Sequence, residues 1–259
     1  MNNFNSLVSP FKVFGSMKMM AAVQAMILIS IWVVLPNQVL PSPLEILKSW
    51  NEMALQDGML VELGKSIVTI WKAIIYSTLI SFSIAYLATA SIFRPVARWL
   101  TALRFLGFAG ITFVFSLWWN NGSDLKIALL TFGMSVFLLT NALSMIESIS
   151  QDQIDYARTL HLSGWRITYE LAFRDRLDEA LDLIRQNAAM GWTMLSMVEG
   201  LVRSEGGIGD LLLNQNKHLH LSAVFAIQIT ILVYGIFQDT ILSYLRTVIC
   251  PYVKFTNAK

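Results

Sequence analysis

The chain has few charged residues and almost no cysteine, and each of these features limits the class of protein to which it can belong. Only 14% of its 259 residues are charged, whereas 55% are hydrophobic and 12% are aromatic. In a soluble domain about a quarter of the residues are charged, so this composition does not suit a protein that is surrounded by water alone. The mean hydropathy of +0.57 favours a polytopic membrane protein. A single cysteine, Cys250, excludes an internal disulfide framework.

Motifs for catalysis and for nucleic-acid binding are also missing. The sequence has no GxxxxGK[ST] phosphate loop, so we expect any ATP hydrolysis to come from a partner. A net charge of +2, spread along the chain, gives no basis for nucleic-acid binding. His218 and His220 are two residues apart and would lie on different faces of a helix, so we predict no metal site. No apolar run contains a convergent catalytic set, and we predict no catalytic residue.

Six apolar runs are candidates for membrane spans, because about 20 helical residues cross a hydrocarbon core of about 30 Å. We therefore predict an all-α polytopic bundle of about six transmembrane helices. Residues 1–18 would form a cytoplasmic segment, and residues 19–259 a single transmembrane domain. The first run should remain as a membrane anchor, followed by an extended stretch at 35–43. The runs cover residues 19–35, 67–93, 100–119, 127–145, 188–202 and 221–245.

Basic residues predict the orientation, because positive charge is retained on the cytoplasmic side of a membrane. They gather before the first run, after the second, between the fourth and fifth, and after the sixth. Both termini and the loop at 146–186 are therefore predicted to face the cytoplasm. The residues concerned are Lys12, Lys18, Arg94, Arg98, Arg158, Arg166, Arg174, Arg176, Arg185, Arg246, Lys254 and Lys259.

The loop at 146–186 has a helical pattern of its own. Ile154, Ala157 and Leu160 recur at helical spacing, Gly164 supplies a turn, and a helical pattern resumes from Trp165. We predict two short amphipathic helices joined at a turn. The pattern alone is equally typical of helices that lie on the membrane surface or cap the bundle.

The stretch DYARTLHLSGW, residues 155–165, resembles the cytoplasmic loop motif of ABC importer permeases, which reads Glu-Ala-Ala, three residues, then Gly. It is most similar to the permease subunits for aliphatic sulfonates, taurine, nitrate and bicarbonate, in which EAARTLGAS and a following Trp are typical. Asp155 takes the place of the Glu. His161 occupies the glycine position, and Arg174 the place of a usual proline. The direct matches are Ala157, Arg158, Thr159, Leu160, Ser163 and Trp165.

Other segments resemble the same family in the same order, over about residues 39–252. VLPSPLEILKSW, at 39–50, is similar to a Leu-Pro-Ser-Pro segment, and residues 190–212 are similar to the fifth span with its glycine-rich exit. The third run departs from the family, because Gly107, Phe108 and Phe113 stand where prolines are usual. Further matching positions are Trp118, Gly122, Lys126, Asn141, Glu199, Gly206, Gly207, Gly209 and Asp239.

The resemblance implies a type I importer permease of the bacterial inner membrane. Two permease subunits, as a homodimer or a heterodimer, would enclose the pathway, and an extracytoplasmic solute-binding protein would deliver a small, mostly anionic solute. A cytoplasmic ATPase dimer would bind ATP and Mg, whereas this chain would bind no cofactor. The contact with the ATPase is expected from Asp155, Ala157, Arg158, Thr159, Leu160, His161, Ser163, Gly164 and Trp165.

Charges inside the apolar runs are the candidates for a pathway or gating role. Glu199 either takes such a role or is solvated at the outer interface. Asp239 and Lys72 are either functional or part of a structural pair or interface. The resemblance adds Asn141, Gly206, Gly207 and Gly209, although the glycine cluster is also typical of a plain turn.

Three further residue sets have more ordinary interpretations. Asp178 and Asp182, one helical turn apart, are interpreted as a solvated face, and the Trp118–119 pair as an interfacial aromatic belt.

At position 161 a histidine replaces the family's glycine, and this removes easy access to a positive φ. We expect a helix that continues through His161, an ATPase cleft shaped for an imidazole, or a solvent-facing ring without a role.

Three alternatives to a symmetric importer permease stay open. One is a divergent half of a heteromeric permease, which the departures at His161, Arg174 and the third run favour. Another is an ion-coupled secondary transporter, and the last is some other polytopic membrane protein that works without an ATPase. Copurification of an ATPase would separate the importer from these last two.

Overall fold

The computed structural model describes residues 17–34, 41–55, 58–90, 92–161 and 163–251. Regular secondary structure in these ranges is entirely helical, which confirms the predicted all-α class. The longer helices are α1 (Met17–Val34), α2 (Pro43–Leu55), α3 (Met59–Leu87), α4 (Arg94–Ala102), α5 (Phe108–Ser116), α6 (Gly122–Glu147), α7 (Gln151–Thr159), α8 (Gly164–Thr168), α9 (Leu177–Leu201), α10 (Ile208–Lys217) and α11 (Leu221–Ile249). Shorter turns are η1 (Leu103–Phe105), η2 (Tyr169–Arg174) and η3 (Arg203–Glu205).

Three of the described helices, α3, α6 and α11, are long and apolar enough to cross a membrane. A fourth candidate is the bent pair formed by α4 with η1 and α5, whose two parts meet at 109°. Residues 19–34 and 188–201 of two predicted runs are helical within α1 and α9, but neither helix belongs to this set. Charged residues fill the first half of α9, which begins at Leu177 rather than near residue 188.

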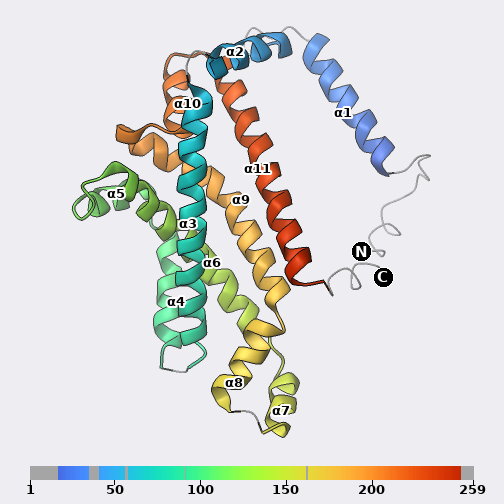
Figure 1. Cartoon of the computed structure of the whole chain (residues 1–259), viewed down its shortest axis with the longest axis vertical. Coiled ribbons are helices and arrows are strands. Elements are labelled where there is room, and N and C mark those ends of the chain that lie inside the picture. The colour runs from blue at the N-terminus through green and yellow to red at the C-terminus, as the bar shows by residue number, and fades with distance from the viewer. Residues whose placement is uncertain (1–16, 35–40, 56–57, 91, 162, 252–259) are drawn as a thin grey trace.

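The span predicted at 100–119 is bent rather than one continuous helix. Leu106 and Gly107 adopt extended backbone conformations, with ψ of 124° and 141°, and interrupt the helix between η1 and α5. The apolar composition of the run gives no sign of this break. As a result α5 folds across the end of α6 rather than continuing the direction of α4 (Figure 1).

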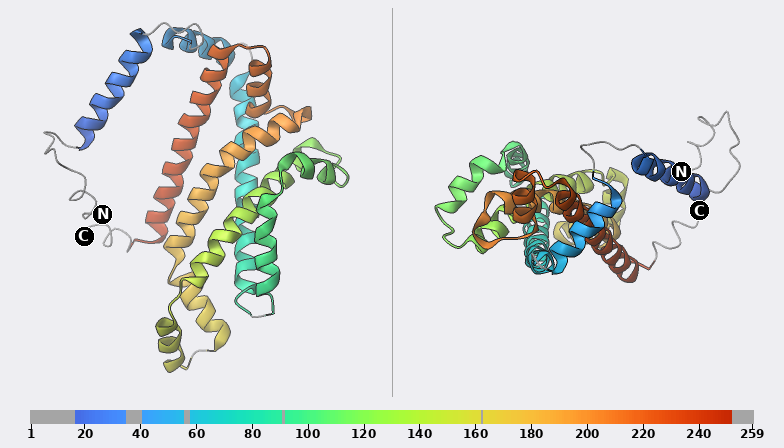
Figure 2. Two further views of the ribbon diagram at one scale, coloured as in Figure 1. Left: turned by 180° about the vertical axis from the view of Figure 1, so that it is seen from behind. Right: turned by 90° about the horizontal axis from the view of Figure 1, so that it is seen from above.

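The core lies where α3, α6 and α9 pack together. Ile70, Leu130, Met134 and Leu195 are fully buried there, and they come from all three helices. Figure 1 and Figure 2 show α11 beside α9, and α1 lying apart from the other helices. Exposed apolar side chains cover the outer face of α11, as suits a helix that faces lipid or another subunit.

Helix α2 extends over the ends of α3 and α11 and follows the stretch at 35–43 that the sequence predicted to be extended. Of that stretch, residues 35–40 lie outside the described residues, and Pro43 already begins α2. Ser49 Oγ donates to Ser222 Oγ at 2.9 Å, and Trp50 Nε1 donates to Thr230 Oγ1 at 3.0 Å. These bonds fasten α2 to α11.

The predicted pair of short helices in the loop is confirmed. Helix α7 starts at a capping box, in which Ser150 and Gln153 each bond the other's backbone N–H. The turn that follows includes Leu160 and His161, and Gly164 is the first residue of α8 rather than part of the turn. Both helices project beyond the bundle at the end opposite to α2 and α10 (Figure 1). Of the predicted terminal segment 1–18, residues 1–16 lie outside the described residues.

Candidate functional site

The candidate site has two parts, which lie at opposite ends of α9. The coupling loop comprises α7, α8 and η2, residues 151–174. The glycine loop comprises residues 206–209, which follow η3 and include the first two residues of α10. Helix α9 joins the two directly, because it begins soon after the coupling loop and ends just before η3.

The coupling loop presents apolar side chains that nothing in the described chain covers. Leu160 is 57% exposed and Trp165 is 54% exposed, and Tyr156 is exposed as well. Ala157 alone of the predicted contact residues is buried. Asp155 and Arg158 form an exposed ion pair at 3.0 Å. Thr159, His161, Ser163 and Gly164 are also exposed, so the predicted contact residues form one accessible surface.

Aromatic side chains hold the coupling loop against the end of α3. The ring of Trp165 lies 5.5 Å from that of Tyr86, measured between centroids. Phe173, within η2, lies 5.3 Å from Tyr86 and 6.1 Å from Phe82. Aromatic pairs at such separations add to the free energy of burial. The loop is therefore packed on the bundle rather than tethered to it.

His161 keeps the backbone conformation that the family's glycine would favour. Its φ is +56°, and its N–H donates to the carbonyl of Arg158 at 2.9 Å. The expected continuation of the helix through His161 is wrong, because α7 ends at Thr159. An L-residue in this region costs about 1 kcal/mol or more, so the turn carries local strain.

Arg174 stands at the end of a π-helical turn, η2. Asp175 N–H donates to Glu170 O at 2.9 Å, a bond five residues back along the chain. The Arg174 guanidinium lies 3.1 Å from the Glu170 carboxylate. A proline at this position could not form the ion pair with Glu170. Turns of the π-helical type occur often at functional sites.

Arg176 attaches the start of α9 to the end of α6. Its guanidinium donates to Ser148 Oγ at 2.6 Å and to the carbonyl of Met145 at 3.3 Å. Arginine at the C-terminus of a helix satisfies carbonyls that have no partner within the helix. This contact joins the start of α9, next to the coupling loop, to the candidate span α6.

An ion-pair network joins the first half of α9 to α11. Arg185 lies 3.0 Å from both Asp182 and Asp239, and Arg246 lies 3.1 Å from Asp182. Asp178 is 3.7 Å from Arg246. The interpretation of Asp178 and Asp182 as a solvated face is therefore wrong, because both carboxylates are half-buried and paired. Asp239, on α11, contacts Arg185, and Arg185 lies far along α9 from Glu199.

Glu199, near the other end of α9, is a buried carboxylate with several hydrogen-bond donors. It is only 1% exposed, so the alternative of a solvated interface residue is wrong. Ser66 Oγ, on α3, donates to it at 2.7 Å from Oε1 and 2.8 Å from Oε2. The N–H of Gly209 donates to Oε2 at 2.8 Å. Charge-assisted bonds of this kind are among the strongest in proteins.

The glycine loop is fixed by further bonds from α3 and α6. Ile208 N–H donates to Ser66 Oγ at 2.9 Å, and Gly207 N–H donates to the Glu62 carboxylate. The buried ammonium of Lys126 donates to the carbonyl of Gly206. The loop is more than a plain turn, because the backbone amides that could hold an external anion are occupied by the chain's own side chains, two carboxylates and one serine hydroxyl.

Two glycines in this loop have no room for a side chain. Gly207 has φ of +112°, and a Cβ there would overlap the carboxylate of Glu199. At Gly209 a Cβ would lie 2.8 Å from the Cα of Ser196, which is backbone and cannot turn aside. The loop and α9 therefore approach closely only because these positions are glycine.

The predicted pathway residues do not all come together. Glu199, Gly206, Gly207 and Gly209 form one cluster, whereas Asp239 belongs to the ion-pair network. Asn141 is half-buried on α6, nearer the coupling loop, and takes no part in the bonds of either group. Among the described residues, no three His, Cys, Asp or Glu side chains are placed to hold a metal ion.

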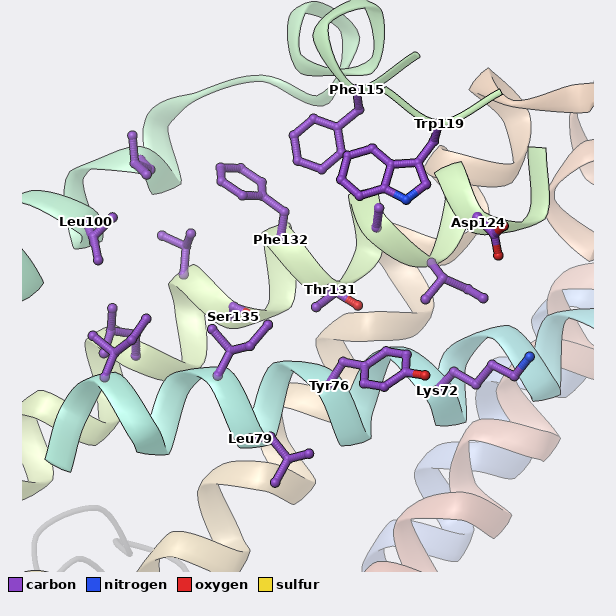
Figure 3. Close-up of a pocket in the computed structure, with 17 residues that line it drawn as sticks. Lys72, Tyr76, Leu79, Leu100, Phe115, Trp119, Asp124, Thr131, Phe132 and Ser135 are labelled. Carbon is purple, nitrogen blue, oxygen red and sulfur yellow. The ribbon is translucent and has the colours of Figure 1, made fainter. Parts of the chain in front are cut away.

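A cavity that sequence reasoning missed lies between α3, α4, α5 and α6. Its volume is about 720 Å³, and Lys72, Tyr76, Trp119, Thr131 and Ser135 contribute polar groups to its wall. Trp119 stacks on Phe115 at 5.3 Å and lines this cavity (Figure 3), and both Trp119 and Trp118 are exposed, so the aromatic belt stays a prediction. The sequence feature that could have indicated this cavity is the pair of hydroxyl residues, Thr131 and Ser135, one helical turn apart in the fourth apolar run.

Comparison with known protein families identifies the family of the chain. A family model for the binding-protein-dependent transport system inner membrane component matches residues 91–248, more than half of the chain. The matched region includes the bent span, the coupling loop and the glycine loop. A search of curated proteins finds no significant match.

Gly209→Ala should destabilise the protein by about 1–3 kcal/mol, because the new Cβ meets the backbone of Ser196. Gly64→Ala is the matched control, since a Cβ there meets nothing within 4 Å. Alanine in the interior of α3 should raise stability by about 0.5–1 kcal/mol. Thermal unfolding in detergent measures both, and equal midpoints for the two variants would contradict the close approach.

His161→Gly should raise the stability of the coupling loop by about 0.5–1 kcal/mol, because glycine adopts a positive φ without strain. His161→Val should lower it, since a β-branched residue is least compatible with this conformation. Hydrogen exchange of the amides of α7 and α8 reports both effects. An order of protection other than Gly above His above Val would contradict the left-handed turn.

Proposed function

Because the chain belongs to the family of binding-protein-dependent transport system inner membrane components, we propose that it transmits the work of an ATPase to a solute pathway through residues 155–165. Membership makes it a non-catalytic, multi-pass permease component of an ABC transport system. The family works in general with an ATPase and with a solute-binding protein. ATP and Mg would accordingly be bound by the ATPase and not by this chain.

The observation that carries the proposal is the packing of the coupling loop. A segment that transmits force must be accessible to its partner and also fixed to the spans behind it. Leu160 and Trp165 supply the accessible apolar surface, and aromatic side chains of this kind are common anchors at interfaces. Trp165 and Arg176 fix the loop to α3 and α6.

Helix α9 gives the proposed movement a route across the molecule. It contains 25 residues, and at a rise of about 1.5 Å per residue it is about 37 Å long. One end follows the coupling loop, and the other carries Glu199, which holds the glycine loop. A tilt of the coupling loop would therefore displace the glycine loop, to which we assign a gating role with Gly206, Gly207 and Gly209. Asn141 and Asp239, on the helices beside α9, are secondary candidates for the pathway.

The finer assignments rest on the sequence motifs. The similarity of residues 155–165 and 39–50 to the sulfonate, taurine, nitrate and bicarbonate permeases supports a small anion as the solute. The distribution of arginine supports a cytoplasmic position for the coupling loop and both termini. A second permease subunit would complete the pathway, as an identical copy or as a different chain, and the unusual His161 and Arg174 favour a different chain.

Single cysteines at Thr159 or Ser163, in a Cys250→Ala background, should crosslink to the ATPase, because both positions are exposed on the coupling loop. Cysteines at Ser123 or Asn216, at the opposite end of the bundle, are the matched controls and should not crosslink. Mass spectrometry of the conjugates identifies the partner. Crosslinks from the control positions alone would contradict both the orientation and the coupling role. Failure of any ATPase to copurify with the chain would contradict the coupling role.

A strain without the gene should lose growth on one small anionic source of sulfur, nitrogen or carbon, and the intact gene should restore it. Loss on sulfonates, but not on sulfate, would assign the solute most directly. Uptake into proteoliposomes should require both the solute-binding protein and ATP. Uptake by the permease alone would contradict an ATP-driven importer.

A further inference from the structure

A pocket lies between the helical bundle and the coupling loop. Its volume is about 550 Å³, within the usual range of ligand pockets, roughly 300–1,000 Å³. Its walls come mainly from the start of α4, the end of α6 and all three parts of the coupling loop. Figure 1 shows that α4 begins at the end of the bundle from which α7 and α8 project. We call it the arginine pocket, because Arg94, Arg98 and Arg158 line it.

The charge of the arginine pocket is positive. Arg94 and Arg98 are one helical turn apart on α4, and Arg158 lines the pocket from α7. Glu147, at the end of α6, is the acidic residue in the lining. Three positive charges therefore face one negative charge. Like charges one turn apart destabilise a helix, so the start of α4 favours a further anion beside it.

Most of the guanidinium donors in this pocket are available to a ligand. A guanidinium has five N–H groups. Arg98 donates to Glu147 at 2.8 Å, and Arg158 donates to Asp155 at 3.0 Å. Within the described part of the chain, Arg94 has neither a side-chain hydrogen bond nor an ion pair. All three arginines are exposed, and exposed ion pairs are weak enough to exchange with another anion.

Helix α7 has no polar contact of its own with the bundle. In the described ranges its side chains form hydrogen bonds only within α7 or with Ser150, which caps it. An anion held by Arg94 and Arg98 on one wall and by Arg158 on the other would connect α4 to α7. A ligand in the arginine pocket would therefore determine how firmly this part of the coupling loop is held.

The start of α4 also has the features of a helix at a membrane surface. Ile92, Phe93 and Trp99 are exposed, and tryptophan is enriched where a membrane meets water. Helix α4 is the first part of the bent candidate span. Basic pockets between membrane helices on the cytoplasmic side are suited to the head groups of anionic lipids. The apolar surroundings therefore favour a lipid over a freely dissolved phosphate.

We propose that the arginine pocket binds the phosphate group of an anionic phospholipid from the cytoplasmic leaflet, with the phosphate oxygens toward Arg94, Arg98 and Arg158. Arginine forms paired, charge-assisted hydrogen bonds with phosphate. The acyl chains stay in the bilayer beside α4, and the head group connects α4 to α7. This inference rests on the cytoplasmic position proposed for the coupling loop, and it adds a lipid that stabilises this loop.

Native mass spectrometry of the full chain in detergent, titrated with phosphatidylglycerol, measures the binding. This lipid should bind saturably. Phosphatidylcholine with the same acyl chains should bind at least about tenfold more weakly, because its choline offsets the phosphate charge. Glycerol 3-phosphate, which has no acyl chains, should also bind at least about tenfold more weakly. Equal binding of either control compound would overturn the lipid assignment.

Hydrogen exchange locates the bound lipid. In nanodiscs that contain phosphatidylglycerol, the amides of α7 should exchange about threefold more slowly than in nanodiscs of phosphatidylcholine alone, because the head group fastens α7 to α4. The amides of α10, at the opposite end of the bundle, are the internal control and should not change. No slowing in α7, or equal slowing in α10, would exclude the arginine pocket as the site.

Variants assign the binding to named groups. Arg94→Gln and Arg98→Gln should each weaken phosphatidylglycerol binding by about threefold, and the double variant should weaken it by about tenfold. The matched controls are Arg104→Gln and Arg166→Gln, which change exposed arginines outside the pocket. Losses of the same size in the controls would show that the lipid responds only to the overall charge of the chain.

Glu147→Gln separates a ligand site from a structural ion pair. It should strengthen phosphatidylglycerol binding by about threefold, because it removes the carboxylate that competes for Arg98. If the Arg98–Glu147 pair serves only to hold α4 to α6, Glu147→Gln and Arg98→Gln should weaken lipid binding equally. That result would refute the site.

Failure of this site and failure of the proposed function give different results. If an ATPase copurifies with the chain and phosphatidylglycerol binds no better than phosphatidylcholine, the importer assignment stands and the lipid site is wrong. If the lipid binds as described and no ATPase copurifies, the site stands and the coupling role is wrong. Loss of ATPase copurification in the Arg94→Gln, Arg98→Gln double variant, with lipid binding unchanged, would assign the pocket to an acidic segment of the ATPase instead.

Discussion

The buried carboxylate of Glu199 constrains much of the structure around it. A carboxylate removed from water is costly unless donors surround it, and here Ser66 and the N–H of Gly209 supply them. This requirement brings α3, α9 and α10 to one place and limits Gly207 and Gly209 to residues without a Cβ. The glycine loop is thus an internally satisfied polar unit within an apolar bundle.

The opposite end of α9 is held by charged side chains of a different kind. Arg176 bonds to the end of α6, and the Arg185 and Arg246 pairs connect α9 to α11. These groups are half-buried, so their bonds can break and re-form at less cost than those of Glu199. The protein therefore combines a more rigid end at the glycine loop with a more adaptable one beside the coupling loop.

The elements that the sequence predicted are those with a local signal. Helices α3, α6 and α11 follow from long apolar runs, and α7 and α8 follow from helical spacing around a turn. The break at Leu106 and Gly107 has no comparable signal, because neither residue is a proline. The partner of Glu199 could not be predicted, since Ser66 is 133 residues away in the chain. The cavity likewise depends on how separate helices pack, and only its hydroxyl pair on α6 has a sequence pattern.

The direction in which the coupling loop points depends on the number of residues in the π-helical turn η2. A π-turn holds one residue more than the α-helical turn it replaces, and one residue in an α-helix corresponds to a rotation of about 100°. Loss of a single residue between Tyr169 and Arg174 would restore a regular helix and swing α7 and α8 about its axis relative to α9. Leu160 and Trp165 would then face a different direction while the bundle stayed intact. A one-codon deletion would in this way turn the exposed surface of the coupling loop without changing any residue in it.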